Sequence, residues 1–368
     1  MEDFNDIFED CTSQGTKIPK EEYLTEGQNI VIDQGQNIVA GYTDREDGIF
    51  EDVPAIIFGD HTRIVKYVDR PFYLGADGVK LLKAKKENAN YKYLFYALRN
   101  ARIPDTGYNR HFKWLKEVKI EYPCLDKQAE VVEILDKLSW IINARKEEQV
   151  SLDNLIKARF VELFGDPIIN SEKLPTMPMT DVCEIIDGDR GKNYPTTDEF
   201  SDEGYCLFLN AKNVTASGFN FDNCMFVSKE KDEALRKGKL SRGDVVLTTR
   251  GTLGNLAFYT DEIPFENVRI NSGMVILRMK QDVIDEVYFI EQFKMQLGDI
   301  KKKIASGSAQ PQLPISTMNK IQVLIPDIER QKDFSEFIKQ VDKSKVAVQK
   351  ALDETQKLFN SLMQEYFG

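Results

Sequence analysis

The sequence predicts an α+β protein with two mixed α/β domains, each followed by one long helix, and with an approximate twofold symmetry between its halves. Three observations support this fold class: an internal repeat, a coiled-coil seam in both copies of that repeat, and short β-rich runs separated by turns. At 368 residues the chain is long enough for two domains, each with its own hydrophobic core.

The internal repeat is the strongest of these signals. Residues 116–165 align without a gap on residues 319–368. Both copies read as an apolar strand, a proline, charged residues, a glutamine, and a long alternation of polar and apolar residues that ends in Phe-Gly. The matched residues are Pro123 and Pro326, Gln128 and Gln331, Phe164 and Phe367, and Gly165 and Gly368. A duplicated unit of one domain followed by one long helix explains this pattern.

Further matches occur upstream, in the same order in both halves. The block 52–59 matches 244–251, and a later glycine and two tyrosines also find partners. The paired residues are Tyr67 and Tyr259, Gly78 and Gly273, and Tyr93 and Tyr288. Differences in length between the blocks are those of surface loops. The duplication therefore extends through the domains as well as the helices.

The repeated helix follows the 4-3 spacing of a coiled coil. Most seam positions are apolar, and the residues between them are largely charged, so the two helices are expected to pair with a solvated outer face. Polar seam residues such as Arg145 and Lys345 either fix the register or extend their charged ends into solvent. A helix of about 36 residues spans roughly 54 Å, which is longer than a globular core needs.

The predicted boundaries follow from these elements. Gly165 can stop the first long helix, and Pro167 prevents it from resuming. The predicted segments are a first domain at 1–123, a first spacer helix at 124–165, a linker at 166–178, a second domain at 179–325 and a second spacer helix at 326–368. The β-rich runs lie at 53–58, 79–82, 244–249 and 274–279.

Composition limits the possible functions. The sequence has no apolar run near the roughly 20 residues that a membrane span requires. The start, Met1-Glu2-Asp3-Phe4, lacks the pattern of a signal peptide, so we expect a cytoplasmic protein. Five cysteines without C-x-x-C spacing and two histidines predict neither a metal site nor a cofactor. The net charge of −11 predicts weak binding to nucleic acid by the chain alone, or phosphate contacts supplied by a partner.

Three motifs resemble the specificity subunits of Type I restriction and modification systems. They are the phrase Ala-Arg-Phe-Val-Glu-Leu-Phe-Gly-Asp-Pro at 158–167, the block Gly-Asp-Val-Val-Leu-Thr-Thr-Arg-Gly-Thr-Leu-Gly at 243–254, and the Pro-x-x-x-x-Gln helix starts. The resemblance spans nearly the whole chain. It implies two target-recognition domains that read a bipartite site in double-stranded DNA, with the repeated helices paired antiparallel as a coiled-coil spacer. It also implies that two methyltransferase subunits dock on these helices and that restriction or translocase subunits join them.

In the second domain we looked for polar and basic side chains beside glycine, because such loops supply base and phosphate contacts. The loop at 248–252 follows an apolar strand, and Arg250 is the residue type that binds guanine through two hydrogen bonds. The alternative is a hairpin turn in which Arg250 pairs with a carboxylate, and ordinary solvated turns are equally compatible with 192–194 and 210–213. The candidate DNA-binding residues are Lys192, Asn193, Tyr194, Asn210, Lys212, Asn213, Thr249, Arg250, Thr252, Ser306, Ser308, Gln310 and Gln312.

In the first domain, the loop at 59–63 occupies the repeat-equivalent position of the Arg250 loop. The stretch at 107–111 corresponds in the same way to 306–312, and the loop at 13–17 is polar and contains glycine. For His61 the alternative is a structural histidine. The candidate DNA-binding residues are Ser13, Gln14, Lys17, His61, Arg63, Asn109, Arg110 and Lys113.

Enzymatic signatures are missing from the sequence. It contains no G-x-x-x-x-G-K-[ST] phosphate loop, no G-x-G-x-x-G fingerprint, and no Asn-Pro-Pro-aromatic tetrapeptide for a flipped base. We therefore predict a non-catalytic recognition subunit. The main alternative is an adaptor that uses its helices to assemble two partner copies without reading DNA; a weaker one is a standalone nuclease or methyltransferase.

Overall fold

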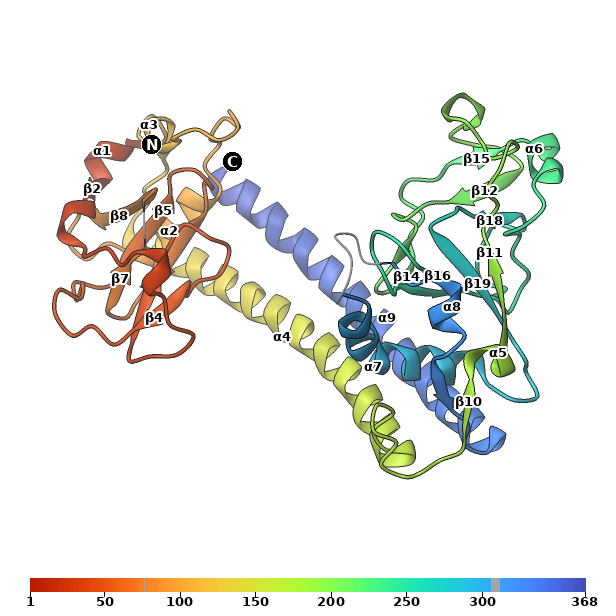
Figure 1. Ribbon diagram of the computed structural model, residues 1–368. Helices are drawn as coiled ribbons and strands as arrows, with labels where there is room; N and C mark the ends of the chain where they lie inside the picture. The colour runs from red at the N-terminus through yellow and green to blue at the C-terminus, as the bar shows by residue number, and fades with distance from the viewer. Residues whose placement is uncertain (76, 306–311) are drawn as a thin grey trace. The chain divides into compact units, whose positions relative to one another are not determined.

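The computed structural model describes residues 1–75, 77–305 and 312–368. The chain divides into two compact units: unit 1 comprises Met1–Glu147 and Val348–Gly368, and unit 2 comprises Glu148–Ala347. The two long helices, α4 (Leu125–Phe164) and α9 (Ile328–Phe367), contribute to both units (Figure 1). The two mixed α/β parts and the two long helices confirm the predicted fold class.

Unit 1 contains two sheets and a short strand pair, in the part of the chain that the structure describes. The antiparallel four-stranded sheet has the order β2-β8-β5-β6, and the three-stranded sheet has the order β4-β3-β7 with β3 and β7 parallel. The remaining pair is β1 with β9. The elements are β1 (Glu2–Asp3), α1 (Phe4–Ile7), β2 (Phe8–Asp10), η1 (Thr12–Gln14), η2 (Lys20–Glu22), β3 (Asn29–Ile32), β4 (Gly41–Thr43), β5 (Ala55–Gly59), β6 (Val65–Val68), β7 (Phe72–Leu74), β8 (Val79–Ala84), α2 (Tyr91–Arg99), α3 (Phe112–Leu115) and β9 (Lys119–Ile120).

Unit 2 repeats this arrangement over its described residues. Its four-stranded antiparallel sheet has the order β11-β19-β16-β17, its three-stranded sheet has the order β15-β12-β18 with β12 and β18 parallel, and β10 pairs with β20. The elements are β10 (Thr176–Pro178), α5 (Met179–Val182), β11 (Cys183–Asp187), η3 (Thr197–Glu199), β12 (Cys206–Leu209), β13 (Val214–Thr215), β14 (Gly218–Phe219), β15 (Phe226–Val227), α6 (Lys229–Ala234), β16 (Val245–Thr248), β17 (Leu256–Phe258), β18 (Val268–Ile270), β19 (Met274–Met279), α7 (Glu286–Ala305), α8 (Ile315–Met318) and β20 (Gln322–Leu324).

The duplication is also visible in matching hydrogen bonds. The hydroxyl of Tyr93 donates to the carbonyl of Glu121 at 2.9 Å, and the hydroxyl of Tyr288 donates to the carbonyl of Leu324 at 3.2 Å. The buried amides of Gln128 and Gln331 likewise donate to the carbonyls of Pro123 and Pro326, at 2.8 and 2.9 Å. In each Pro-x-x-x-x-Gln motif, the glutamine side chain therefore bonds the proline that precedes the helix and links each domain to the start of its own helix.

The strand registers correct one part of the predicted repeat. Gly59 pairs with Val79 across β5 and β8, whereas Thr248 pairs with Met274 across β16 and β19. Since Gly78 and Gly273 stand just before β8 and β19, Gly59 corresponds to Thr248 and not to Gly251. The predicted match of 52–59 with 244–251 was wrong by three residues, because register is set by pairing with the neighbouring strand and not by the shared Asp-Val and Gly letters.

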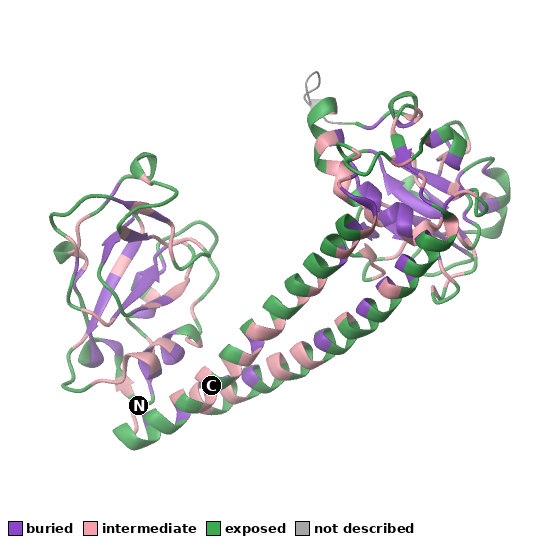
Figure 2. Cartoon of the chain, turned by 90° about the horizontal axis from the view of Figure 1, so that it is seen from below, coloured by how far each residue is buried: buried purple, intermediate pink, exposed green. Residues whose placement is uncertain are grey.

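The helix pair is antiparallel within unit 2. Lys345 of α9 contacts Asp153 of α4 at 2.6 Å, and Arg330, earlier in α9, donates to the carbonyl of Leu163, later in α4, at 2.5 Å. In unit 1, Val131 and Leu135 of α4 share a core with Phe359 of α9. Figure 2 shows buried and half-buried positions along both helices, with exposed positions between them.

The predicted seam is confirmed, since every one of its residues is buried or half-buried. In α4 these are Val131, Leu135, Leu138, Ile142, Arg145, Gln149, Leu152, Ile156, Arg159 and Leu163; in α9 they are Phe334, Ile338, Val341, Lys345, Val348, Leu352, Thr355, Phe359, Leu362 and Tyr366.

The helix ends and the linker add two details. Gly165 has a φ of 73°, the left-handed conformation that ends a helix and favours glycine. The last three residues of the expected linker form β10, because they pair with β20, a partner that a local reading of the sequence does not reveal. Among the residues that the structure describes, none of the helices combines the length and apolar composition needed to cross a bilayer.

Candidate functional site

The candidate residues of unit 1 gather at one end of its four-stranded sheet. Asp10, at the end of β2, lies opposite Leu82, and Gly59, at the end of β5, lies opposite Val79 at the start of β8. The segments that leave β2 and β5 therefore lie at the same end of the sheet as the segment that enters β8. Ser13 and Gln14 follow β2 and are exposed on η1.

The loop after β5 is fastened to the loop that precedes α3. Asp60 is buried, and its carboxylate accepts a hydrogen bond from the backbone N–H of Phe112 at 2.7 Å. Its carbonyl accepts from the backbone N–H of His111 at 2.7 Å, and the His111 ring contacts the same carbonyl at 3.0 Å. The loops at 59–63 and 105–111 thus form a single surface.

His61 and Arg63 both face the second of these loops. The His61 ring stacks on Tyr108, with centroids 4.6 Å apart and planes 8° from parallel, and Tyr108 is 87% exposed. Arg63 has a φ of 61° and pairs with Asp105 at 2.8 Å. The pKa of Asp105 is lowered, first by a hydrogen bond from the backbone of Gly107 and then by Arg63. Arg63 therefore has the kind of carboxylate partner that was considered for Arg250.

Gln34 joins these loops to a third one and was not predicted. Its side-chain carbonyl accepts from the backbone N–H of His61 at 3.1 Å, and its amide donates to the carbonyl of Asp77 at 3.2 Å. Its backbone carbonyl accepts from the hydroxyl of Thr62 at 2.7 Å. The run Gln-Gly-Gln-Asn at 34–37 has the polar, glycine-bearing composition sought elsewhere, so the signal was available in the sequence.

The remaining unit 1 candidates are exposed and differ in the side chains that they contact. Lys17 forms an exposed ion pair with Asp77 at 3.1 Å, and Lys113 lies 4.0 Å from the centre of the Trp114 ring. Asn109 and Arg110 are exposed next to Tyr108. These side chains can reorient toward a ligand at small cost, because exposed ion pairs contribute about 0 to 1 kcal/mol.

In unit 2, residues from three loops line one hollow of about 210 Å³. Arg250 follows β16, Gln312 precedes α8, and Arg190 follows β11. Arg190 donates to Asp187 at 3.0 Å and to the carbonyl of Ser272 at 3.2 Å. The sequence did not single out Arg190, although Gly-Asp-Arg-Gly at 188–191 has the composition of the other candidate loops. Two guanidinium groups and one amide thus share a site that can bind hydrogen-bond acceptors.

Arg250 differs from Arg63 in its surroundings. Its side chain is exposed and makes no ion pair or hydrogen bond within the described ranges. The loop itself is held in place through Thr249, which is 6% exposed: its backbone N–H and hydroxyl both donate to the carbonyl of Gly273, at 2.8 and 3.0 Å. A fixed backbone therefore presents an unpaired arginine, as recognition of a base edge requires.

Several unit 2 candidates serve the fold instead. Asn213 is fully buried, and its amide donates to the carbonyls of Asn220 and Asn223 at 3.0 and 2.9 Å. Tyr194 packs edge-on against Phe208, and Asn193 donates to the carbonyl of Ala234 at 3.0 Å. The side chains of Asn213 and Thr249 are both occupied by hydrogen bonds to backbone carbonyls, so neither is part of the candidate interface.

The other unit 2 candidates fall into two groups. Lys192, Lys212 and Thr252 are exposed, and Asn210 is half-buried with its side-chain carbonyl accepting from the backbone of Lys212 at 2.9 Å. Ser306, Ser308 and Gln310 lie outside the described residues.

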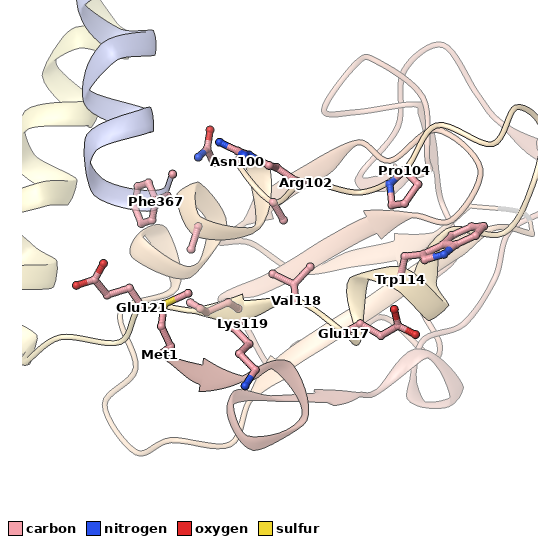
Figure 3. Close-up of a pocket in the computed structure, with 14 residues that line it drawn as sticks. Met1, Asn100, Arg102, Pro104, Trp114, Glu117, Val118, Lys119, Glu121 and Phe367 are labelled. Carbon is pink, nitrogen blue, oxygen red and sulfur yellow. The ribbon is translucent and has the colours of Figure 1, made fainter.

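Unit 1 also contains a hollow of about 520 Å³ (Figure 3). Three parts of the chain border it: the segment after α2, strand β9, and the end of α9. Arg102, Trp114, Lys119 and Phe367 lie around it, together with the acidic Glu117 and Glu121. None of the unit 1 candidates lines this hollow within the described residues. Its mixed charges do not favour an anionic ligand, and we do not include it in the site.

Comparison with known families gives one match over most of the chain. The family described as the Type I restriction modification DNA specificity domain matches residues 3–152 and 172–356. These two ranges contain every candidate loop described above.

The individual relatives described next have low sequence identity to this chain. The specificity subunit of the Type I restriction enzyme EcoR124I/EcoR124II of Escherichia coli is 28% identical over 138 residues, which cover 32% of this chain and 34% of that protein, about a third of its length. The S subunit of a Type I restriction-modification system from M. genitalium has a TM-score of 0.60 at 18% identity, covering 100% of this chain and 95% of the other. A chain from a structure of type I R-M complex assembly and conformational transition has a TM-score of 0.56 at 16% identity, covering 97% and 92%. At these identities the structures establish a shared fold.

Proposed function

Because this chain belongs to the Type I restriction modification DNA specificity domain family, we propose that it is the DNA sequence-specificity subunit of a Type I restriction-modification complex. In this role it reads a bipartite site in double-stranded DNA and is not itself catalytic. Methylation and cleavage come from the methyltransferase and restriction subunits that it brings to the site.

The observation that carries this proposal is the matched placement of polar loops in two duplicated units. In unit 1, the loop after β5 is hydrogen-bonded to the segment before α3, where the backbone N–H of His111 donates to the carbonyl of Asp60 at 2.7 Å. In unit 2, the loop after β16 is bonded in the same way to the segment before α8, where the backbone N–H of Leu313 donates to the carbonyl of Thr249 at 3.0 Å. Both loops present a side chain suited to bases, His61 in unit 1 and Arg250 in unit 2. Two similar scaffolds with different loop residues fit a site made of two different half-sequences.

The acidic balance of the chain fits a recognition subunit that works within a complex. With a net charge of −11, the chain alone gains little of the counterion release that drives DNA binding. Base contacts supply selectivity, and phosphate contacts from partner subunits supply much of the affinity. We therefore expect selective binding to become strong only after assembly.

The long helices supply the docking surface for those partners. Leu155 on α4 and Leu358 on α9 occupy matched positions of the repeat and are both exposed, by 47% and 50%. Exposed leucines that recur at equivalent places in a duplicated protein fit two copies of one partner, each bound in the same way. This supports a stoichiometry of two methyltransferase subunits per chain.

The decisive experiment maps methylated positions in the DNA of cells with and without this protein. A split motif methylated only in its presence is the expected result, and the map gives both half-sequences. A labelled duplex with that motif should then bind the chain together with its methyltransferase subunits more tightly than a shuffled duplex at the same salt concentration. Partner assembly without any preference between the two duplexes would contradict the proposal and favour the adaptor.

A further inference from the structure

The last turns of α7 carry a basic surface that the base-reading loops do not include. Lys301 and Lys302 are exposed and form no ion pair within the described residues, while Lys303 is paired with Asp299 at 2.6 Å. Lys301 and Lys302 are thus cations without an acidic partner among the described residues, in a chain of net charge −11. Free lysines of this kind are what a phosphate backbone attracts.

Contacts of α7 place this surface next to the Arg250 loop. Gly254, which ends that loop, packs against the end of the Leu297 side chain of α7, since an added Cβ would stand 2.3 Å from Leu297 Cδ1. Lys301 is one turn after Leu297 and therefore projects from the same side of the helix. Lys301 therefore lies at the border of the proposed base-reading surface, and Lys302 is the next residue along the helix.

The surface of α7 is also uncovered at Gly298 by the described residues. Gly298 is one turn before Lys302, and a Cβ added there would meet no atom of the described residues within 4 Å beyond its own helix. A glycine inside a helix costs roughly 1 kcal/mol relative to alanine, and packing within unit 2 gives no reason for it. Such a position allows another molecule to approach the helix backbone closely.

The corresponding helix of unit 1 carries no equivalent pair of lysines among its described residues. Its corresponding helix, α2, ends at Arg99 after nine residues, whereas α7 has twenty. The single lysine of α2, Lys92, is paired with Asp136 at 2.5 Å, and the Arg99 guanidinium lies over the Phe359 ring. The two units therefore differ in the unpaired basic charge that this helix carries.

From these observations we propose that Lys301 and Lys302 form a phosphate-binding site at the end of α7, which anchors the DNA backbone beside the half-site read by unit 2. The inference rests on the proposed function, and it assigns these lysines a role in affinity and none in base selectivity.

The test is a salt titration of binding by the assembled complex of full-length chain and methyltransferase subunits. The probes are a labelled duplex with the mapped motif and a shuffled duplex. Each lost phosphate contact reduces the slope of log Kobs against log salt by about 0.9, so the double variant K301Q/K302Q should lose up to about twice that. Its affinity should fall by the same factor on both duplexes, with an unchanged methylation motif.

The control is Lys280→Gln, which removes an exposed lysine just after the opposite end of β19 and should leave the slope unchanged. Lysines in a last helical turn also interact with the helix dipole, and thermal unfolding of each variant separates that effect from DNA contact. A slope equal to that of the unaltered protein, with or without a loss of thermal stability, would overturn the inference while leaving site preference intact. Failure of the proposed function shows up differently, as equal affinity of the unaltered complex for both duplexes.

Discussion

Arg63 is held by Asp105, with 2.8 Å between a guanidinium nitrogen and a carboxylate oxygen. Arg250, in the corresponding loop of unit 2, makes no such pair within the described residues. The two arginines share a candidate function and differ in what they give up on binding a base. Arg63 must first release its carboxylate, whereas Arg250 is available at once.

Arg250→Ala should weaken recognition of one half-site by about 10- to 100-fold, since a bidentate arginine contact is worth about 1 to 3 kcal/mol of base discrimination. Assembly with the methyltransferase subunits should be unchanged, because the side chain is exposed and unpaired within the described residues. Genome-wide mapping of methylated positions would reveal a relaxed base in one half of the motif. Arg63→Ala is the matched comparison and should cause a smaller loss in the other half. Loss of assembly with an unchanged motif would contradict the role of Arg250.

Gln331→Ala should destabilise the protein more than Gln128→Ala, by about 1 to 2 kcal/mol, since one hydrogen bond usually contributes about 1 kcal/mol. Both amides donate to a proline carbonyl, but Gln331 also donates to the carbonyl of Val283 at 3.3 Å and accepts from the backbone N–H of Asp285 at 2.9 Å. The corresponding oxygen of Gln128 has no partner among the described residues. Urea unfolding of the two variants measures the difference. Equal losses would show that the bonds to Asp285 and Val283 add no net stability.

Asp153→Asn should reduce stability by at most about 1 kcal/mol, because Asp153 is largely exposed and solvent screens its pair with Lys345. Burial alone lowers the pKa of Lys345, but the hydrogen bond to Asp153 and the charges of Asp153 and Asp342 raise it above the ordinary 10.5. A raised pKa means that the pair stabilises the fold fully below pH 10.5 and loses that contribution as the pH rises through the raised value. Thermal unfolding should show a constant difference from the unaltered protein at neutral and mildly alkaline pH, and none once Lys345 is deprotonated. A difference that persists in strong alkali would point to packing instead.

Leu155→Glu and Leu358→Glu should each remove one methyltransferase subunit from the complex, since each places a charge on one of two matched apolar surfaces. Native mass spectrometry of the assembled complex counts the subunits that remain. Val150→Asp is the control, because Val150 is 59% exposed and its matched position already carries Asp353. Retention of both subunits in both glutamate variants would place the docking surface elsewhere.

The sequence was most informative where local pattern and tertiary structure agree. The 4-3 spacing of apolar residues identified both helices and ten buried or half-buried positions on each, because one periodicity determines which side of a long helix is buried. It did not include Phe160 and Met363, which are also buried. It was less informative for β10, whose strand character depends on pairing with β20 more than a hundred residues away. The three-residue error in matching β5 to β16 has the same origin, since strand register is a property of pairs.

Candidate side chains were harder to judge, because residue type alone does not reveal burial. Asn213 and Arg250 both stand in polar turns after a strand, yet Asn213 is fully buried and Arg250 is exposed. Gln34 and Arg190 were overlooked although their runs have the same composition as the chosen loops. Only the three-dimensional grouping of strand ends shows that they belong to the same surfaces.

The tie between each domain and its helix, from Gln128 to Pro123 and from Gln331 to Pro326, lies apart from the loops that follow Gly59 and Thr248. Substitutions in those loops are therefore expected to leave both ties intact. Under the proposed function, such a substitution would change the DNA target of one unit and preserve the helix surface on which we expect partners to dock.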